Sequence, residues 1–164
     1  VEFMTRTSKS DAPRALGKAA SGGELSRILL SIKQIVGEGV HPRTYLFDEV
    51  DTGVSGETAE KVGRKLRSIA KGQQVISVTH LPQVAAHGDA HFFIQKKTSK
   101  DSASMDVNEL TADSRVREIA RLISGEKVTP TSLAHAKQLL ADAAPKSAAK
   151  SASHKVRRES GLAR

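Results

Sequence analysis

Apolar residues between positions 24 and 36 recur every three or four residues, which is the spacing of a helix with one buried face. The apolar positions are Leu25, Ile28, Leu29, Ile32, Ile35 and Val36. Gly37 and Gly39 come next and favour the end of a helix there. The pattern predicts a helix over residues 24–36, and it places a Ser-Gly-Gly turn, residues 21–23, at the N-terminus of that helix.

Two short apolar runs, residues 44–47 and 74–79, favour strands and are typical of buried parallel strands. Residues 55–71, between them, carry a helical stripe of apolar side chains. A β-α-β unit has a right-handed crossover, so both strands end at the same edge of the sheet, where open α/β sheets bind ligands. The polar residues that fall on this edge are Asp48, Glu49 and His80.

The second half of the chain carries a different pattern. Residues 92–96 and 104–110 predict an antiparallel hairpin, joined by the polar stretch 97–103. Asp113 is suited to cap a following helix, and Thr129-Pro130 is suited to open another. The expected fold class is therefore α/β, with parallel strands and flanking helices, a β-hairpin and C-terminal helices.

The N-terminal residues give weaker signals. The chain begins at Val1 rather than at a methionine, which we interpret as the boundary of a fragment. The first five residues favour a strand, and residues 8–18 contain Ser, Asp, Pro and Gly. We therefore expect residues 8–18 to form a loop that leads to the Ser-Gly-Gly turn.

Composition indicates one soluble domain followed by a basic tail. Of the 164 residues, 38% are hydrophobic and 27% are charged, which suits a single globular core. The net charge is +8, and residues 143–164 hold six lysines and arginines against one acid. That segment has almost no large apolar residue, so it cannot bury enough surface to offset the entropy of ordering. We predict a domain over residues 1–142 and a disordered basic tail over residues 143–164, which either contacts DNA phosphates or only keeps the chain soluble.

Several classes of protein and site are disfavoured. No apolar run approaches the ~18 residues of a membrane span, and the N-terminus does not resemble a signal peptide, so we expect no membrane partner and a cytoplasmic location. The chain has no cysteine, which excludes disulfides and thiolate zinc sites. His87, His91 and Asp89 allow a metal site as an alternative, but Gly88 disfavours the helix that such a site needs.

Two motifs carry candidate chemistry. Asp48 and Glu49 follow an apolar strand, where one carboxylate can hold Mg²⁺ through water and the next can polarise an attacking water. The alternative is a pair of solvated acids at a turn. Residues 21–24, Ser-Gly-Gly-Glu, offer a hydroxyl and unhindered N–H groups at the positive end of a helix dipole, which suits a phosphate. Their alternative is a serine N-cap followed by a flexible turn.

Two further motifs follow in order, and one expected motif is missing. Asp51-Thr52-Gly53 either belongs to the site or forms an Asx turn, and His80 either bonds a phosphate or is structural. No stretch fits Gly-x-x-x-x-Gly-Lys-Ser/Thr, the loop that holds the phosphates of ATP. Gly17-Lys18 is a poor substitute, because Ala19 stands where a hydroxyl is needed. The motifs therefore describe about half of an ATPase site.

The residues around these motifs resemble a known family. Residues 20–27, 47–56 and 79–85 are similar to the C-terminal half of the RecN family of bacterial DNA-repair proteins, relatives of the SMC proteins. The resemblance runs from about Val1 to Leu140. It implies the C-terminal lobe of an ABC-type ATPase head, whose phosphate loop lies in an N-terminal half of the protein. A transporter ATPase more often has glutamine and proline where this chain has Glu24 and Val50.

The resemblance also implies a role for each motif residue. Ser21, Gly22, Gly23 and Glu24 match the signature that binds the γ-phosphate of ATP held by an opposing head. Asp48 would assist Mg²⁺, and Glu49 would be the general base. Asp51 would be the D-loop residue that communicates across the dimer, His80 would be the switch histidine, and Arg27 would couple the signature helix to the partner. ATP and Mg²⁺ are thus the implied cofactors.

The implied mechanism is an ATP-driven clamp. Two identical heads would sandwich two ATP molecules, and hydrolysis would release them, in a protein of the nucleoid that acts on DNA in double-strand-break repair and recombination. The chain alone should then be inactive or nearly so until the missing N-terminal half completes the head. The alternative hypothesis is a non-catalytic DNA-binding module that acts through the basic tail. A transporter subunit would need a phosphate loop in the same domain.

Overall fold

The computed structural model describes residues 2–6, 9–19, 21–36, 42–98 and 103–145. The elements are β1 (Met4–Thr5), β2 (Arg14–Ala15), α1 (Leu16–Ala19), α2 (Gly22–Val36), β3 (Thr44–Phe47), α3 (Gly56–Ile69), β4 (Gln74–Ser77), α4 (Pro82–Ala85), β5 (Phe92–Thr98), β6 (Ala103–Glu109), α5 (Ala112–Ser124) and α6 (Pro130–Ala143). The expected α/β class, with its hairpin and C-terminal helices, is confirmed. Most of the predicted tail, from residue 146 onward, lies outside the described residues.

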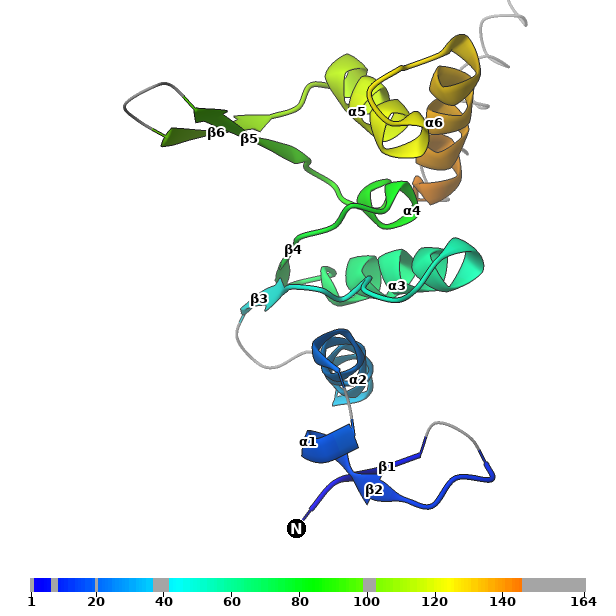
Figure 1. The fold of residues 1–164 in the computed structure, drawn as a ribbon. Helices are drawn as coiled ribbons and strands as arrows, with labels where there is room; N and C mark the ends of the chain where they lie inside the picture. The colour runs from blue at the N-terminus through cyan, green and yellow to red at the C-terminus, as the bar shows by residue number, and fades with distance from the viewer. Residues whose placement is uncertain (1, 7–8, 20, 37–41, 99–102, 146–164) are drawn as a thin grey trace, which may run out of the picture.

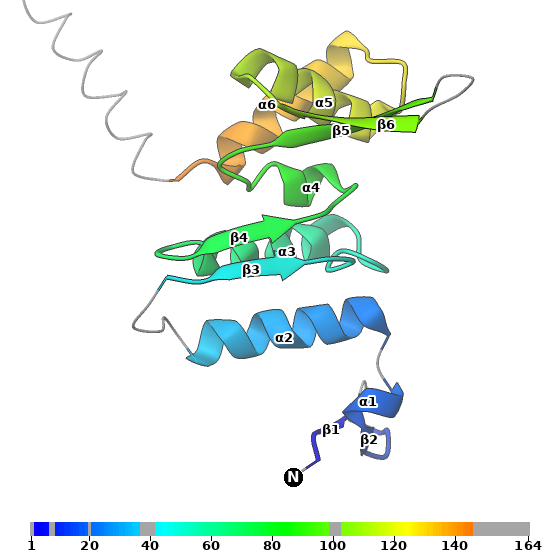
Figure 2. The same ribbon diagram turned by 90° about the vertical axis from the view of Figure 1, so that its left-hand side faces the viewer.

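The β3–α3–β4 unit is the centre of the chain. β3 and β4 pair in parallel from Thr44 opposite Gln74 to Phe47 opposite Ser77. Figure 2 shows both strands running in the same direction, with α3 behind them and α2 alongside. The predicted β-α-β unit is confirmed, although β4 ends two residues before the predicted Thr79. The carboxyl ends of both strands therefore meet at one edge of the sheet, as the sequence predicts.

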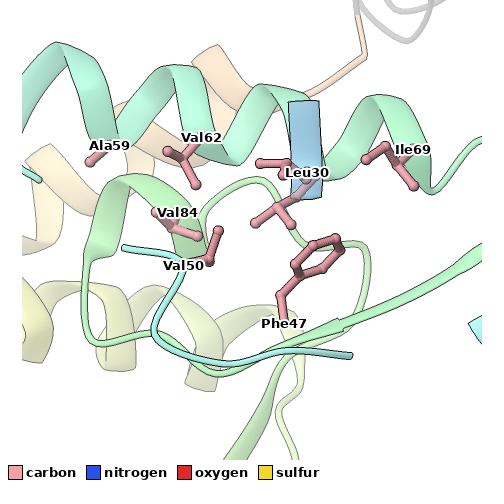
Figure 3. Packing of buried hydrophobic residues seen from close by; sticks show 8 residues of the cluster. Leu30, Phe47, Val50, Ala59, Val62, Ile69 and Val84 are labelled. Carbon is pink, nitrogen blue, oxygen red and sulfur yellow. The ribbon is translucent and has the colours of Figure 1, made fainter. Parts of the chain in front are cut away.

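One face of this sheet is packed and the other is open. Phe47 is buried in a cluster to which α2, α3 and α4 contribute, and Figure 3 shows Leu30, Val50, Val62 and Val84 around it. The opposite face carries apolar side chains that are largely exposed. The prediction of buried strands therefore holds for one face only in this chain, because the described residues place no element over the other face.

The C-terminal helices form a second cluster with the short helix α4. Ile119 and Ala120 of α5 pack against Ala136 of α6 and Ala85 of α4. These helices have distinct N-terminal caps. Thr129 and Ser132 form a reciprocal capping box, which confirms the predicted opening of α6 at Thr129-Pro130. For α5 the predicted cap was wrong. Thr111 accepts from the N–H of Ser114, and Asp113 lies in the first turn.

The β5–β6 hairpin is antiparallel, as predicted, and projects from the body of the molecule (Figure 1). It is longer than expected, because pairing continues to Thr98 opposite Ala103 and shortens the predicted polar connection. The guanidinium carbon of Arg121 on α5 lies 5.9 Å from the centre of the Phe93 ring, and this contact joins the hairpin to the C-terminal helices.

The N-terminal prediction was partly wrong. Residues 14–18, expected in a loop, belong to β2 (Arg14–Ala15) and α1 (Leu16–Ala19). β2 pairs with β1 through Met4 opposite Ala15, and the N–H of Leu16 donates to the carbonyl of Phe3 at 2.8 Å. These contacts join residues 11 and 13 positions apart, so local turn signals gave no sign of them. Within the described ranges, no helix is long and apolar enough to cross a membrane.

Candidate functional site

The predicted edge of the sheet gathers residues from two loops. Asp48 and Glu49 directly follow β3 and are exposed. The loop after β4 continues alongside, because the N–H of Val78 donates to the carbonyl of Phe47 at 3.1 Å. His80 follows in this loop with its side chain 75% exposed. The three residues that the sequence assigns to this edge thus lie on loops that leave the same end of the sheet.

Asp51 joins the two loops directly. Its side chain is only 3% exposed. The hydroxyl of Thr79 donates to Asp51 Oδ2, and the backbone N–H of His80 donates to the same oxygen at 3.3 Å. The imidazole Nδ1 of His80 lies 3.7 Å from this oxygen. The structure therefore brings Asp51 and His80 together, and it adds Thr79, whose hydroxyl the sequence reasoning did not use.

The N-terminus of α2 carries the Ser-Gly-Gly-Glu motif. The N–H of Ser21 donates to Glu24 Oε2 at 2.9 Å, and the N–H of Glu24 points to Ser21 Oγ at 3.4 Å. This reciprocal pattern is a capping box, so the serine N-cap weighed as an alternative is present. Gly22 and Gly23 lie between the two residues of this capping box and begin helix α2. The sequence prediction of a Ser-Gly-Gly turn at a helix N-terminus is confirmed.

Two side chains of α2 tie the helix to the turn after β3. Ser26 Oγ donates to the carbonyl of Asp48 at 3.0 Å. Arg27 Nη1 donates to the carbonyl of Thr52 at 2.7 Å and lies 3.4 Å from the carbonyl of Val50. Arg27 thus contacts the Asp51 turn of its own chain. Sequence reasoning assigned no role to Ser26, and only its place beside the signature motif could have indicated one.

Glu49 has an unusual backbone conformation. Its φ of 54° is positive, and among the described residues no other non-glycine residue shares this feature. Such a conformation costs about 1–3 kcal/mol and persists where surrounding contacts enforce it. Here the N–H of Glu49 donates to Asp48 Oδ1 at 2.9 Å, and its carbonyl accepts from the N–H of Thr52 at 3.0 Å. The tight turn therefore holds both carboxylates at the carboxyl edge of the sheet.

The two glycines of the motif lie against this turn. A Cβ added to Gly22 would stand 2.9 Å from Glu49 Oε2, the mobile end of a side chain. A Cβ added to Gly23 would stand 2.9 Å from the backbone carbonyl oxygen of Glu49 and 3.1 Å from Thr52 Cβ. Gly23 is therefore required by close packing within this chain, independently of any ligand.

We expect Gly23→Ala to lower the free energy of unfolding by about 1–3 kcal/mol, because the Glu49 backbone has to move. Gly22→Ala should cost less, since only a flexible carboxylate has to turn away. Gly17→Ala is the control, because a Cβ there meets nothing within 4 Å; it should leave stability unchanged or raise it by up to about 1 kcal/mol, since Gly17 lies in α1. Urea unfolding of the three variants measures the order. Equal midpoints for the Gly23 and Gly17 variants would contradict the packing argument.

The oxygen donors at this edge suit Mg²⁺ bound together with a nucleotide. Among the residues that the structure describes, no group of three or more His, Cys, Asp or Glu could hold a metal ion by itself. Mg²⁺ is usually held by one or two carboxylates together with phosphate oxygens and water. Exposed Asp48, with Glu49 beside it, fits that pattern and is the residue that would hold the ion.

The alternative metal site at the histidines receives no support from the geometry. The buried ring of His87 packs against Gly63 of α3, where an added Cβ would clash with it. Burial lowers the pKa of the His87 imidazole, and the positive charge of Arg67 lowers it further. The Asp89 carboxylate accepts a hydrogen bond from Arg67 at 2.7 Å. These contacts indicate that His87 and Asp89 have structural roles, joining the segment after α4 to α3.

Known proteins similar to this chain are DNA repair proteins. No protein-family model matches. The chain is 39% identical over 140 residues to the DNA repair protein RecN of Treponema pallidum, covering 85% of this chain and 24% of that protein. It is 44% identical over 140 residues to RecN of Halalkalibacterium halodurans, covering 85% and 25%. It is 42% identical over 143 residues to RecN of Bacillus subtilis, covering 87% and 25%.

A solved structure also resembles the chain, with a TM-score of 0.46 and 16% sequence identity. The similarity covers 72% of this chain and 70% of the solved chain. That structure is described as concerning ATP-driven dimerization and DNA-stimulated activation of SMC ATPases. The chain spans about a quarter of the length of the curated relatives it matches. Identity of about 40% over most of the chain shows that it is homologous to RecN, the DNA repair protein of these bacteria, and that it corresponds to one segment of such a protein.

Proposed function

We propose that the chain is the C-terminal lobe of an ABC-type ATPase head, which hydrolyses ATP once a second lobe supplies the phosphate loop. The observation that carries the proposal is that direct hydrogen bonds join three segments of the chain at the carboxyl edge of the β3–β4 pair. Ser26 and Arg27 bond α2 to the turn after β3, and Asp51 bonds that turn to the loop after β4. These hydrogen bonds hold together the N-terminal part of α2, the turn with its two exposed carboxylates, and the loop that carries His80.

The open face of the sheet supports the need for a second lobe. Leu46, Ile76 and Val78 on this face are 71%, 47% and 58% exposed. Parallel sheets are normally covered on both faces, so an apolar face of this kind indicates a missing partner. The matched segment of this chain corresponds to only 24% of the relative from Treponema pallidum, and no stretch of this chain fits a phosphate loop. We propose that the N-terminal half of the head, which carries this loop, covers the face.

The roles of the site residues follow from this proposal. Ser21, Gly22, Gly23 and Glu24 contact the γ-phosphate of ATP held by an opposing head. Asp48 assists Mg²⁺, and Glu49 is the general base. Asp51 belongs to the turn through which the heads communicate, and His80 forms a hydrogen bond with the phosphate. The exposure of Glu49 leaves its carboxylate accessible to water, and the N-terminus of α2 favours an anion. When bound, Mg²⁺ would neutralise the charge of the phosphates.

The proposed setting is DNA repair. The relatives are named DNA repair proteins, and we propose that a protein containing this lobe works in the same process, in double-strand-break repair and recombination. Its two identical heads would close on two ATP molecules and open after hydrolysis, so that ATP acts as a clamp on DNA. We place such a protein in the cytoplasm with the nucleoid.

The second lobe can be tested through the open sheet face. Leu46→Lys should weaken binding of the chain to the N-terminal half of a RecN relative by about tenfold or more, because it leaves a charge in an apolar contact. Val128→Lys, on the connection between α5 and α6, is the control and should bind as the unaltered chain does. Calorimetric titration with ATP and Mg²⁺ present measures both. Equal affinity for all three chains would contradict the proposed covering of this face.

A further inference from the structure

The side chain of Asp51 differs from its neighbours. Asp48 and Glu49 are exposed, whereas Asp51 is 3% exposed. Burial of a carboxylate is costly unless hydrogen-bond donors surround it. The donors here are the Thr79 hydroxyl and the backbone N–H of His80, which both reach Oδ2. The carboxylate is therefore directed toward the loop after β4 and away from solvent.

Thr79 supports this loop from two sides. Its hydroxyl donates to Asp51 and accepts from the N–H of Leu81 at 3.0 Å. A hydroxyl can do both, because it has one proton to donate and lone pairs to accept with. The backbone of His80 lies between these two hydrogen bonds and makes its own with Asp51. The His80 ring is 75% exposed, and its Nδ1 lies 3.7 Å from the same Asp51 carboxylate oxygen.

From this geometry we infer that Thr79 is a positioning residue of the site, which holds His80 in place through the buried carboxylate of Asp51. The inference rests on the proposed function, because it concerns the histidine that meets the phosphate. Asp51 lies two residues after Glu49, so the same contact fixes the distance between the histidine loop and the loop that carries the general base. Thr79 acts through Asp51 and His80 and does not itself meet the nucleotide.

Two substitutions at one position test the inference. Thr79→Val keeps the shape of the side chain and removes the hydroxyl, whereas Thr79→Ser keeps the hydroxyl. In a head completed by the N-terminal half of a RecN relative, we expect Thr79→Val to lower kcat for ATP by roughly 10- to 100-fold, as for a misplaced catalytic group, with KM changed less than about threefold. Thr79→Ser should restore kcat to within about threefold. Equal kcat for Thr79→Val and the unaltered head, or no rescue by serine, would overturn the inference.

A second measurement uses the 164-residue chain without nucleotide. Hydrogen exchange of the His80 amide, followed by NMR, should accelerate by about tenfold or more in Thr79→Val and stay unchanged in Thr79→Ser, because the carboxylate that holds this amide loses its own anchor. Unchanged exchange in Thr79→Val would overturn the inference. This readout does not depend on ATP. If the completed, unaltered head shows no turnover, the proposed function fails, and hydrogen exchange still decides whether Thr79 fixes His80.

A double substitution serves as the control for a loss of stability in Thr79→Val. Thr79→Val leaves the buried carboxylate short of one donor, which can lower stability on its own. Asp51→Asn removes this charge, so the double variant Asp51→Asn with Thr79→Val should fold even where the single variant does not. If Thr79 acts only through Asp51, adding Thr79→Val to Asp51→Asn should change kcat by less than about threefold. A loss equal to the product of the two single losses would overturn the inference.

Discussion

Glu49→Gln, introduced into a head completed by its phosphate-loop half, is expected to slow ATP hydrolysis by about 10²- to 10⁴-fold, the usual contribution of a general base. The amide has the shape of the carboxylate but cannot take a proton from water. Glu49 is exposed, so the change removes no buried contact and should leave ATP binding intact. Heads that bind ATP without hydrolysing it should accumulate as closed dimers. Single-turnover hydrolysis, ATP titration and sedimentation measure the three effects.

The control for this variant is Glu109→Gln, an equally conservative change of an exposed glutamate at the end of β6. It should leave turnover, binding and dimerisation unchanged. A different result at Glu49 would be informative. If Glu49→Gln abolished ATP binding, the carboxylate would act mainly in holding the nucleotide, and the assignment as general base would be wrong.

The central unit of the fold could be predicted from the sequence because its signals are local. Residues 44–47 and 74–77 are short apolar runs on either side of a strongly periodic helix, and a right-handed crossover then leaves one arrangement of the two strands. The parallel register confirms this. The edge carrying Asp48, Glu49 and His80 followed from the same rule, so the location of the candidate site was predictable once the strands were identified.

The contacts inside the site could not be predicted in the same way. Asp51 and Thr79 are 28 positions apart, and no periodic pattern indicates that one carboxylate accepts from the other loop. Arg27 was expected to act toward a partner, and its observed hydrogen bonds are to carbonyls of its own chain. The positive φ of Glu49 could not be predicted either, since glutamate has no intrinsic preference for it and the enforcing hydrogen bonds form only in the folded turn.

The open sheet face shows a further limit of sequence patterns. Leu46 and Ile76 belong to apolar runs, and such runs predict strands buried on both faces. In this chain both side chains are exposed. A run of apolar residues does not indicate which polypeptide covers it, and we propose that a second lobe does. The discrepancy supports the proposal of a second lobe more strongly than a fully buried sheet would.

The second large effect concerns the completed site. In ATPases of the proposed class a loop of backbone N–H groups and a lysine holds the phosphates of ATP, and no stretch of this chain fits that motif. The carboxylates and the α2 N-terminus alone offer few groups that could bind ATP. We therefore expect no turnover above background from the isolated chain, and a typical enzyme rate of about 1 s⁻¹ or more when the phosphate-loop half is added. A half-head whose loop lysine is replaced by alanine is the control, because it can assemble without holding the phosphates.

The measurement that tests the account most directly is steady-state ATP turnover of the pure chain, with and without the N-terminal half of a RecN relative. The account predicts background rates for either piece alone, restored turnover for the mixture, and background again with the lysine variant. Turnover of about 1 s⁻¹ or more by the isolated chain would contradict it, since a complete phosphate site would then exist within these 164 residues.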